Sequence, residues 1–403
     1  MEAFWVPWLH MHQPLVWLDD KLESNLKKMI LSQDSKESWD GKLIARAYKN
    51  PAKYIERLSK FNPKIVLDFS GILLESLDKL SEFLKDVEVE GEKIGNIIES
   101  YKNVLRKFPD SIEFAGSAYS HCYFPVTPER DWKWQIREWQ NVFSSLFGKN
   151  HLKKVKGFWL PEMGTPSYGD KLSRLIKILK DFGYEWIILP IFSVNDYEKI
   201  SYEDRVRIFS KPNKISINDQ EITTLFSTPY YFLDQQAGMD ASYVYEQCLK
   251  AKKILNLEKP ALIITASDGE NGNVMMNQFF PETYTTFFTK FKDQSVSSIL
   301  VSEFLEKYYR GEKLEKVELK LIGASWVGGH ERWIWGEKRA SIAKKIDELS
   351  EKVNEVGDED LLKLLLIAET SCYVYWGTDY WFSQGGRILD VIEKKLKNFS
   401  KNF

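Results

Sequence analysis

The sequence has few cysteines, and none is placed for a disulfide framework or a zinc knuckle. Cys122, Cys248 and Cys372 are scattered along the chain and form no CxxC pair. Scattered cysteines are typical of proteins of a reducing compartment. The N-terminus has no basic stretch followed by an apolar one, and no apolar run approaches the roughly 18 residues of a membrane span. We therefore expect a cytoplasmic protein with no membrane-spanning segment.

An excess of charge of one sign is also missing. The chain has 56 Lys and Arg against 58 Asp and Glu, which gives a formal net charge of −2. A nucleic-acid-binding domain usually has a strongly basic balance, so we expect no nucleic-acid partner. Among the 403 residues, 43% are apolar and 28% are charged, as in an ordinary soluble globular protein. The sequence leaves the oligomeric state open.

Aromatic residues are abundant instead. The chain contains 14 Trp, 19 Tyr and 24 Phe, together 14% of its residues. Trp and Tyr join a flat apolar face to a polar tip, so they suit both protein cores and wet binding grooves. Composition alone leaves both interpretations open.

Short β-rich runs, several of them almost continuously apolar, alternate with amphipathic helical patterns. Continuous apolar strands are typical of parallel sheets covered on both faces, and the alternation indicates crossover helices. Seven such strands favour a closed barrel over an open sheet. The expected strands are Ala3–Leu9, Lys64–Phe69, Ser111–Ala115, Val155–Leu160, Glu185–Ile191, Glu221–Ser227 and Ala261–Ala266.

The pattern changes after about residue 310. Earlier helices, such as Asp170–Phe182 and Tyr243–Leu255, lie between strands, whereas the later segments are helical with few β-branched runs. We therefore expect an α/β barrel over residues 1–310 and a helical domain over residues 311–403. The later helices are expected at Ala340–Val356, Glu359–Tyr375 and Arg387–Asn398.

Histidines follow two of the expected strands. His10 and His12 come after the first strand, and His121 comes after the third. The carboxyl ends of barrel strands form the face that carries chemistry. A lone histidine is more often structural, but three on one rim favour a functional site.

Carboxylates follow two other strands at the same face. Glu162 comes just after the fourth strand, behind Trp159 and Pro161. Asp268 and Glu270 follow the seventh strand, where Gly269 lets the backbone turn sharply. A polar loop with a helix cap is the alternative reading of this last segment.

Two carboxyl groups across a barrel mouth are the apparatus of glycoside hydrolysis. One must stay ionised as the nucleophile, while burial or a neighbouring charge keeps the other protonated as the acid. Aromatic rings around the mouth would stack on sugar rings, and histidines would bind hydroxyl groups. The two observations together predict a glycosidase.

Six segments, in chain order, resemble the motifs of glycoside hydrolase family 57, whose members act on α-glucans and related α-glycosides. Each motif is weak alone, but their order over nearly the whole chain is specific. The segments are His12-Gln13-Pro14, Gly116–Pro125, Gly157–Glu162, Asp268-Gly269-Glu270-Asn271, Gly323–Trp326 with Trp333–Glu337, and Ala368–Ser371 with Tyr375–Gly377.

The resemblance implies a (β/α)7 barrel followed by a helical domain that completes the substrate cleft. It implies a retaining α-glycoside hydrolase of α-amylase or amylopullulanase type, without metal or other cofactor, acting on an α-glucan or malto-oligosaccharide. Glu162 would be the nucleophile and Asp268 the acid/base. The residues expected to bind substrate are His10, His12, His121, Trp159, Glu270, Trp326, Trp333 and Trp376.

Departures from the family pattern leave the substrate open. Cys372 stands where the branch it resembles has an Asp, and the aromatics of Ser227–Gly238 are unusual for that loop. A 4-α-glucanotransferase on the same site is the main alternative. More distant ones are a metal-dependent barrel amidohydrolase, since His10-x-His12 resembles such a site, and a non-catalytic glucan-binding protein. Glu270 also competes with Asp268 for the acid role.

Overall fold

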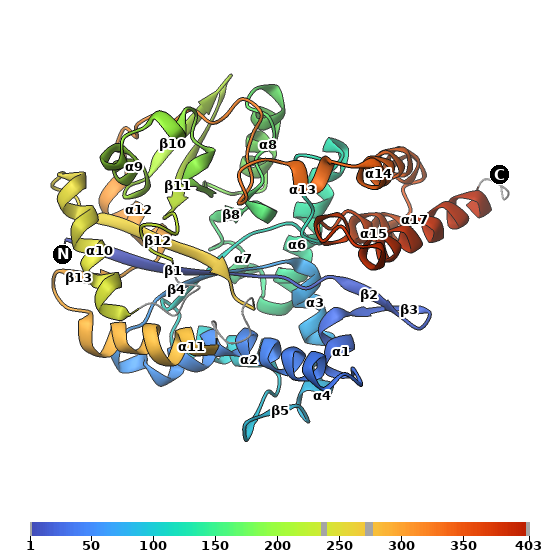
Figure 1. The fold of residues 1–403 in the computed structure, drawn as a ribbon, viewed down its shortest axis with the longest axis horizontal. Helices are drawn as coiled ribbons and strands as arrows, with labels where there is room; N and C mark the ends of the chain where they lie inside the picture. The colour runs from blue at the N-terminus through green and yellow to red at the C-terminus, as the bar shows by residue number, and fades with distance from the viewer. Residues whose placement is uncertain (1, 235–239, 271–276, 400–403) are drawn as a thin grey trace.

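The computed structural model describes residues 2–234, 240–270 and 277–399. Two sheets, one parallel and one mixed, form its centre (Figure 1). The first has the order β12-β1-β4-β7, and β13 pairs with the start of β1. Its strands are β1 (Ala3–Met11), β4 (Ile65–Phe69), β7 (Ile112–Ala115), β12 (Ala261–Asp268) and β13 (Val296–Ser298).

The second sheet contains three parallel strands and one antiparallel edge strand, β10, which pairs with β11. Its order is β10-β11-β9-β8. Its strands are β8 (Gly157–Trp159), β9 (Trp186–Pro190), β10 (Asn213–Ile217) and β11 (Gln220–Ser227).

Backbone hydrogen bonds at both seams join the two sheets into a barrel. Gly116 N donates to Gly157 O at 2.8 Å, next to the end of β7, and Thr228 N donates to Ile264 O on β12 at 2.9 Å. The ring therefore contains β1, β4, β7, β8, β9, β11 and β12, all parallel. This (β/α)7 barrel confirms the fold expected from the sequence, and each of the seven expected strands is present. The expectation missed β10, the three-residue β13 and two short hairpins. The hairpins pair β2 (Leu15–Leu18) with β3 (Lys21–Ser24) and β5 (Glu88–Val89) with β6 (Glu92–Lys93).

Alternate residues of each strand point into the barrel, as the two-residue period of a strand requires. On β1 the row begins with Phe4, Val6 and Trp8, which belong to the apolar cluster filling the lumen. Continued by the same period, that row reaches His10 and His12 at the carboxyl end. The polar site is therefore the top layer of the side-chain stack that fills the barrel.

Helices cover the outside of the barrel, and an apolar cluster lies between them and the strands. None of the helices among the described residues is long and apolar enough to cross a membrane. The main ones are α2 (Ser35–Arg57), α3 (Gly71–Lys79), α5 (Ile97–Lys107), α6 (Glu129–Phe147), α8 (Asp170–Asp181), α9 (Tyr202–Phe209), α10 (Ala241–Leu255) and α12 (Val301–Tyr309). Shorter ones are α1 (Asn25–Ile30), α4 (Ser81–Leu84), α7 (Lys149–Leu152) and α11 (Asn277–Phe279).

The C-terminal helices gather beside α6, at the right of Figure 1. They are α13 (Glu331–Ile334), α14 (Glu337–Val356), α15 (Glu359–Ala368), α16 (Cys372–Tyr375) and α17 (Asp379–Phe399). The single helix expected over Glu359–Tyr375 is wrong, because the chain leaves the helix between α15 and α16. There Thr370 forms a β-bridge with Cys122, and Ser371 N donates to His121 O at 3.0 Å. The last helix also begins earlier than the expected Arg387.

Candidate active site

Glu162 sits just past β8, in a short 3-10 turn over Pro161–Met163. Its backbone is left-handed, with φ 58°, a conformation that costs a residue with a side chain about 1–3 kcal/mol. Its side chain is only 11% exposed. Strain of this kind persists where the surrounding structure fixes it, and such residues cluster at functional sites.

Both carboxylate oxygens of Glu162 accept a hydrogen bond. The hydroxyl of Ser371 is 2.6 Å from Oε1, and the indole N–H of Trp326 is 2.7 Å from Oε2. Burial raises the pKa of Glu162, while these two donors lower it. Burial outweighs the donors, so the pKa of Glu162 stays above its usual range, although the two hydrogen bonds reduce the shift.

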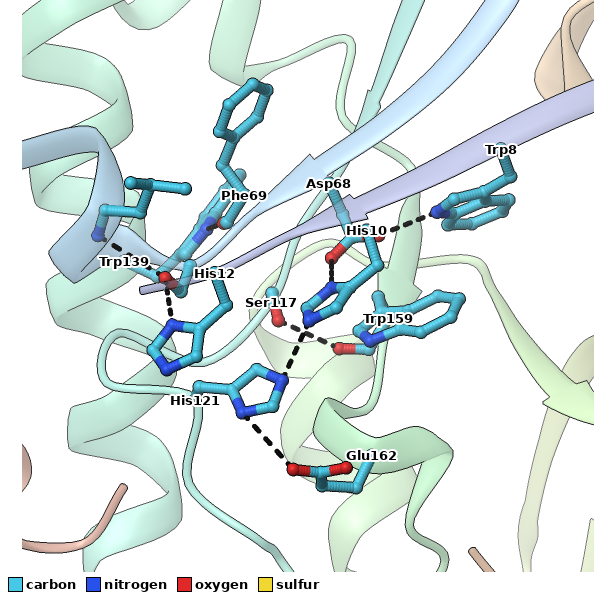
Figure 2. A network of polar contacts seen from close by, with 12 residues as sticks. Trp8, His10, His12, Asp68, Phe69, Ser117, His121, Trp139, Trp159 and Glu162 are labelled. Atoms are coloured by element: carbon cyan, nitrogen blue, oxygen red, sulfur yellow. Dashed lines mark hydrogen bonds and ion pairs between the residues drawn. The ribbon is translucent and has the colours of Figure 1, made fainter. Parts of the chain in front are cut away.

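A row of polar contacts runs from β4 to Glu162 (Figure 2). Asp68 Oδ2 accepts from the indole N–H of Trp8 at 2.7 Å, and Asp68 Oδ1 lies 2.5 Å from Nδ1 of His10. Nε2 of His10 lies 2.8 Å from Nε2 of His121. Nδ1 of His121 is 3.7 Å from Oε1 of Glu162. The row links a fully buried carboxylate to the candidate nucleophile.

The three histidines also stack on one another. The rings of His12 and His121 are 4.2 Å apart and nearly parallel, at 8°. The rings of His10 and His121 are 4.8 Å apart. Trp159 stacks behind His10 at 4.9 Å. The stack fixes the imidazole planes and leaves little freedom for the rings to turn.

The three imidazoles differ in charge. Burial opposes a charge on His10, but the Asp68 carboxylate outweighs it and raises the pKa of His10 to about 9. Burial also raises the pKa of Asp68, and the hydrogen bonds from His10 and Trp8 offset only part of that rise. Burial, reinforced by the other imidazoles, lowers the pKa of His12 and of His121 well below the usual range. His10 is therefore cationic, and His12 and His121 are neutral.

Asp268 ends β12 directly beside the end of β1, where its Cα pairs with that of His10. Glu270 follows two residues later, and its buried Oε2 has no hydrogen-bond partner among the described residues. Burial and then the charge of Asp268 raise the pKa of Glu270 well above its usual range. The negative charge of Asp268 therefore helps burial to favour the protonated form of Glu270. Asn271 of this motif lies outside the described residues.

The expected tryptophans fall into two groups. Trp159 and Trp333 are buried, at 5% and 1% exposed, and Trp333 stacks on Tyr123. Both rings pack against other rings of the site, so a contact of either with a sugar stays a prediction. Trp326 and Trp376 are 45% and 58% exposed, which suits ring stacking. Trp335, which sequence reasoning did not select, is 67% exposed.

His12, His121 and Cys372 form the one group of metal-ligand residues found among the described parts of the chain, with ligand atoms within 4.8 Å of one another. Zinc needs lone pairs that converge tetrahedrally on one point. Both ring nitrogens of His121 already have partners, and its ring is nearly parallel to that of His12. Lone pairs in two stacked planes do not converge. These three side chains therefore do not form a fitting zinc site.

Sequence reasoning missed two further residues of the site. Asp68 is fully buried within the apolar strand β4, and a lone Asp in such a strand was an available signal. Ser371 lies in the break between α15 and α16 and contacts Glu162 from 209 residues away in the sequence. A helix-like pattern hid that break, so no local signal marked the serine.

A parallel barrel with two carboxyl-bearing residues at strand ends on one rim is an arrangement that glycoside hydrolases use, among other barrel enzymes. Residues 6–318 match the sequence profile of glycosyl hydrolase family 57, and the chain belongs to this family. No curated protein sequence matches it.

Solved structures of the family resemble the chain at low sequence identity. A 4-α-glucanotransferase from Thermococcus litoralis has a TM-score of 0.68 and 14% identity, with 98% of this chain and 60% of the other covered. A family 57 branching enzyme from Thermococcus kodakaraensis has 0.65 and 16%, with 98% and 90% covered. An α-amylase from Thermotoga maritima has 0.63 and 12%, with 100% and 93% covered. At these identities the likeness shows the fold alone, and this chain spans 60% of the length of the glucanotransferase.

Proposed function

We propose that this protein is a retaining α-glycoside hydrolase acting on α-glucans, with Glu162 as nucleophile and Asp268 as acid/base. One observation carries the proposal: the Glu162 carboxylate stands at the barrel mouth, largely buried, with a donor on each oxygen. A surface carboxylate would not be held in this way. Membership of a glycoside hydrolase family supports the same reaction class.

The reaction would proceed in two displacements. In the first, a Glu162 oxygen bonds to the anomeric carbon, the glycosidic C–O bond breaks, and Asp268 gives its proton to the departing oxygen. In the second, Asp268 takes a proton from water, whose oxygen bonds to the anomeric carbon and releases Glu162. Two inversions at one carbon retain its configuration.

An orphaned polar atom supports a sugar-binding role for His12. Its Nδ1 contacts the hydroxyl of Ser70 at 2.7 Å, but its buried Nε2 has no partner among the described residues. A buried polar group left unpaired costs about 1–3 kcal/mol, which a sugar hydroxyl would recover. Glu270 Oε2 is orphaned likewise. We place both residues, with His121, around the sugar at the cleavage point.

We also propose that residues 311–403 form a helical domain that completes the cleft of a barrel domain over residues 1–310. Trp326 and Ser371, both in this later part, contact Glu162 directly. The exposed indoles of Trp326 and Trp376 would stack on sugar rings of the substrate.

Transfer to a sugar acceptor, as in a 4-α-glucanotransferase, is the second candidate. The exposed ring of Trp335 supports it, because an acceptor sugar needs a binding surface in addition to Trp326 and Trp376. Hydrolysis and transfer share the first displacement. They differ in whether water or a sugar hydroxyl then attacks the glycosyl-enzyme.

Incubation with a defined malto-oligosaccharide, followed by mass spectrometry of all product lengths, tests both candidates. Shorter products alone indicate hydrolysis, and longer ones as well indicate transfer. Glu162→Ala should abolish both, whereas the exposed Glu203→Ala on α9 should abolish neither. Binding without turnover, unaffected by Glu162→Gln, would instead favour a non-catalytic glucan-binding protein.

A further inference from the structure

We propose that Ser371 is a positioning residue for the nucleophile, the last member of a hydrogen-bonded chain that runs from Asp68 through His10 and His121 to Glu162. The inference rests on the proposed function for its consequence in turnover, because that function makes Glu162 the nucleophile. The chain itself rests on contacts between side chains that are all largely buried.

The chemistry of each member fixes the direction in which its hydrogens point. A carboxylate only accepts, so Nδ1 of His10 donates to Asp68 at 2.5 Å. A cationic His10 also carries a hydrogen on Nε2, which it donates to Nε2 of His121 at 2.8 Å. His121 is then neutral with its own hydrogen on Nδ1. This tautomer is set by His10 and not by solvent.

Ser371 accepts a hydrogen bond from His121 and donates its own hydrogen bond to Glu162. Nδ1 of His121 is 2.9 Å from Oγ of Ser371, and Oγ is 2.6 Å from Oε1 of Glu162. Because His121 supplies the hydrogen of the first contact, the serine hydroxyl is free to donate in the second. Every link therefore has a single direction, and the serine can only be a donor to the carboxylate.

The backbone holds Ser371 in this position as well. Its N–H donates to the backbone oxygen of His121 at 3.0 Å, so both its backbone and its side chain contact one residue. Ser371 is 1% exposed. In a continuous helix the backbone N–H of Ser371 would bond to a carbonyl of the same helix. Because the helix is broken between α15 and α16, this N–H bonds to His121 instead, and the hydroxyl reaches Glu162.

The positive charge of His10 lowers the pKa of Glu162, as the hydroxyl of Ser371 does. Besides His121 and Ser371, the titratable groups that face Glu162 are His10, Asp268, Tyr123, Tyr375 and Cys372. Ser371 and the cation of His10 lower the pKa of Glu162, whereas Asp268 raises it. Removing the hydroxyl or the cation should therefore move the pKa of Glu162 upward.

The pH dependence of kcat/KM on malto-oligosaccharide tests the chain from both ends. Ser371→Ala removes the donor, and we expect the acid limb of the profile to move up by about one pH unit, with kcat reduced about tenfold and KM little changed. Ser371→Thr keeps a hydroxyl and should restore the wild-type limb. Asp68→Asn, which touches no substrate in the proposed site, should move the limb in the same direction by weakening the cation of His10.

The double variant and a matched control make the test specific. If one chain carries both effects, Ser371→Ala with Asp68→Asn should shift the limb by less than the sum of the single shifts. Ser298→Ala removes another buried serine hydroxyl, one without a partner among the described residues, and should leave the limb unchanged. Additive shifts would overturn the chain, as would an unmoved limb in a folded Ser371→Ala protein.

A titration without substrate separates this inference from the proposed function. Carbon-13 NMR can follow the Glu162 carboxyl, assigned by its loss in Glu162→Gln, in wild type and Ser371→Ala. An upward shift of its pKa supports the chain even in a protein inactive on malto-oligosaccharides, where only the proposed function would fail. Identical titration curves would overturn the chain in an active enzyme and an inactive one alike.

Discussion

The indole N–H of Trp326 donates a hydrogen bond of 2.7 Å to Oε2 of Glu162, although 164 residues separate the two in the sequence. The backbone confirms the approach, because Trp326 N donates to the Glu162 carbonyl oxygen at 2.9 Å. The ring itself is 45% exposed. One residue of the later part of the chain therefore both binds the candidate nucleophile and presents an aromatic face to solvent.

Trp326→Phe should separate these two roles. Phenylalanine keeps an aromatic face for a sugar but has no N–H, so Glu162 loses a donor that lowers its pKa. We expect the acid limb of the kcat/KM profile to move upward by about one unit, with KM changed less than threefold. The profile measured between pH 4 and 8 checks this.

Trp376→Phe is the matched control for this change, because Trp376 is comparably exposed and none of its described contacts reaches Glu162. The control should leave the acid limb in place. An identical shift in both variants would mean that aromatic packing, and not the hydrogen bond, sets the limb.

Trp333 and Trp335 should respond to truncation in opposite ways, although only two positions separate them. Trp333 is fully buried against Tyr123, so Trp333→Ala should lower the free energy of unfolding by about 3–5 kcal/mol. Trp335 is 67% exposed, so Trp335→Ala should change that free energy little. Its effect should instead be a raised KM for long malto-oligosaccharides, with short ones unaffected. Denaturant unfolding and kinetics on a length series measure the two effects, and a destabilised Trp335→Ala protein would contradict the assignment.

The strands and the rim of the barrel could be predicted because their signals are local. Seven apolar runs gave seven strands, and the two-residue period of β1 carries the inward row from Trp8 to His10 and His12. The contacts of Glu162 could not be predicted in the same way. Ser371 reaches it only because tertiary bonds to His121 interrupt a helix whose periodicity continues through the break.

The two neighbouring tryptophans make the same point for the cleft. The motif around Trp333 gave no indication of which indole is buried, because the stacking of Trp333 on Tyr123 is a tertiary contact. Tertiary packing settles such positions, whereas composition and spacing do not.

Glu113 gives the protein a pH-dependent stability away from the site. It lies on β7, and its carboxylate accepts hydrogen bonds from the backbone and hydroxyl of Ser302 at the start of α12. Burial outweighs these donors and raises the pKa of Glu113 from 4.5 to about 7. The folded state then binds a proton that the unfolded state has released.

This contribution to stability should be complete below pH 4.5 and lost as the pH rises through 7. The free energy of unfolding should fall over that interval by on the order of 3 kcal/mol through this group. Glu113→Gln removes the titration, so its unfolding curve should depend less on pH there, whereas Glu203→Gln should behave as wild type. Urea unfolding at several pH values decides, and equal slopes for Glu113→Gln and wild type would refute the assignment.

Substitutions of Asp268 and of Glu270 should affect the alkaline limb of the pH–rate profile differently. A general acid is active only while protonated, so its titration sets that limb. We expect Asp268→Asn to lose the alkaline limb and to lower kcat/KM by about 10²–10⁴. Glu270→Gln should keep the limb, because its carboxyl group would act as a protonated ligand of the sugar. The opposite pattern would assign the acid role to Glu270.

The leaving group makes this distinction sharper. The fluoride ion of an α-glucosyl fluoride departs without a proton, so the first displacement by Glu162 does not need the acid. Asp268→Asn should therefore lose far less of the first-step rate on the fluoride than on a malto-oligosaccharide, whereas Glu270→Gln should lose about equally on both. Release of fluoride ion in single-turnover experiments measures that step. Asp268→Asn also removes the negative charge that raises the pKa of Glu270, so an alkaline limb that persists at lower pH in this variant would show that Glu270 had taken over the proton transfer.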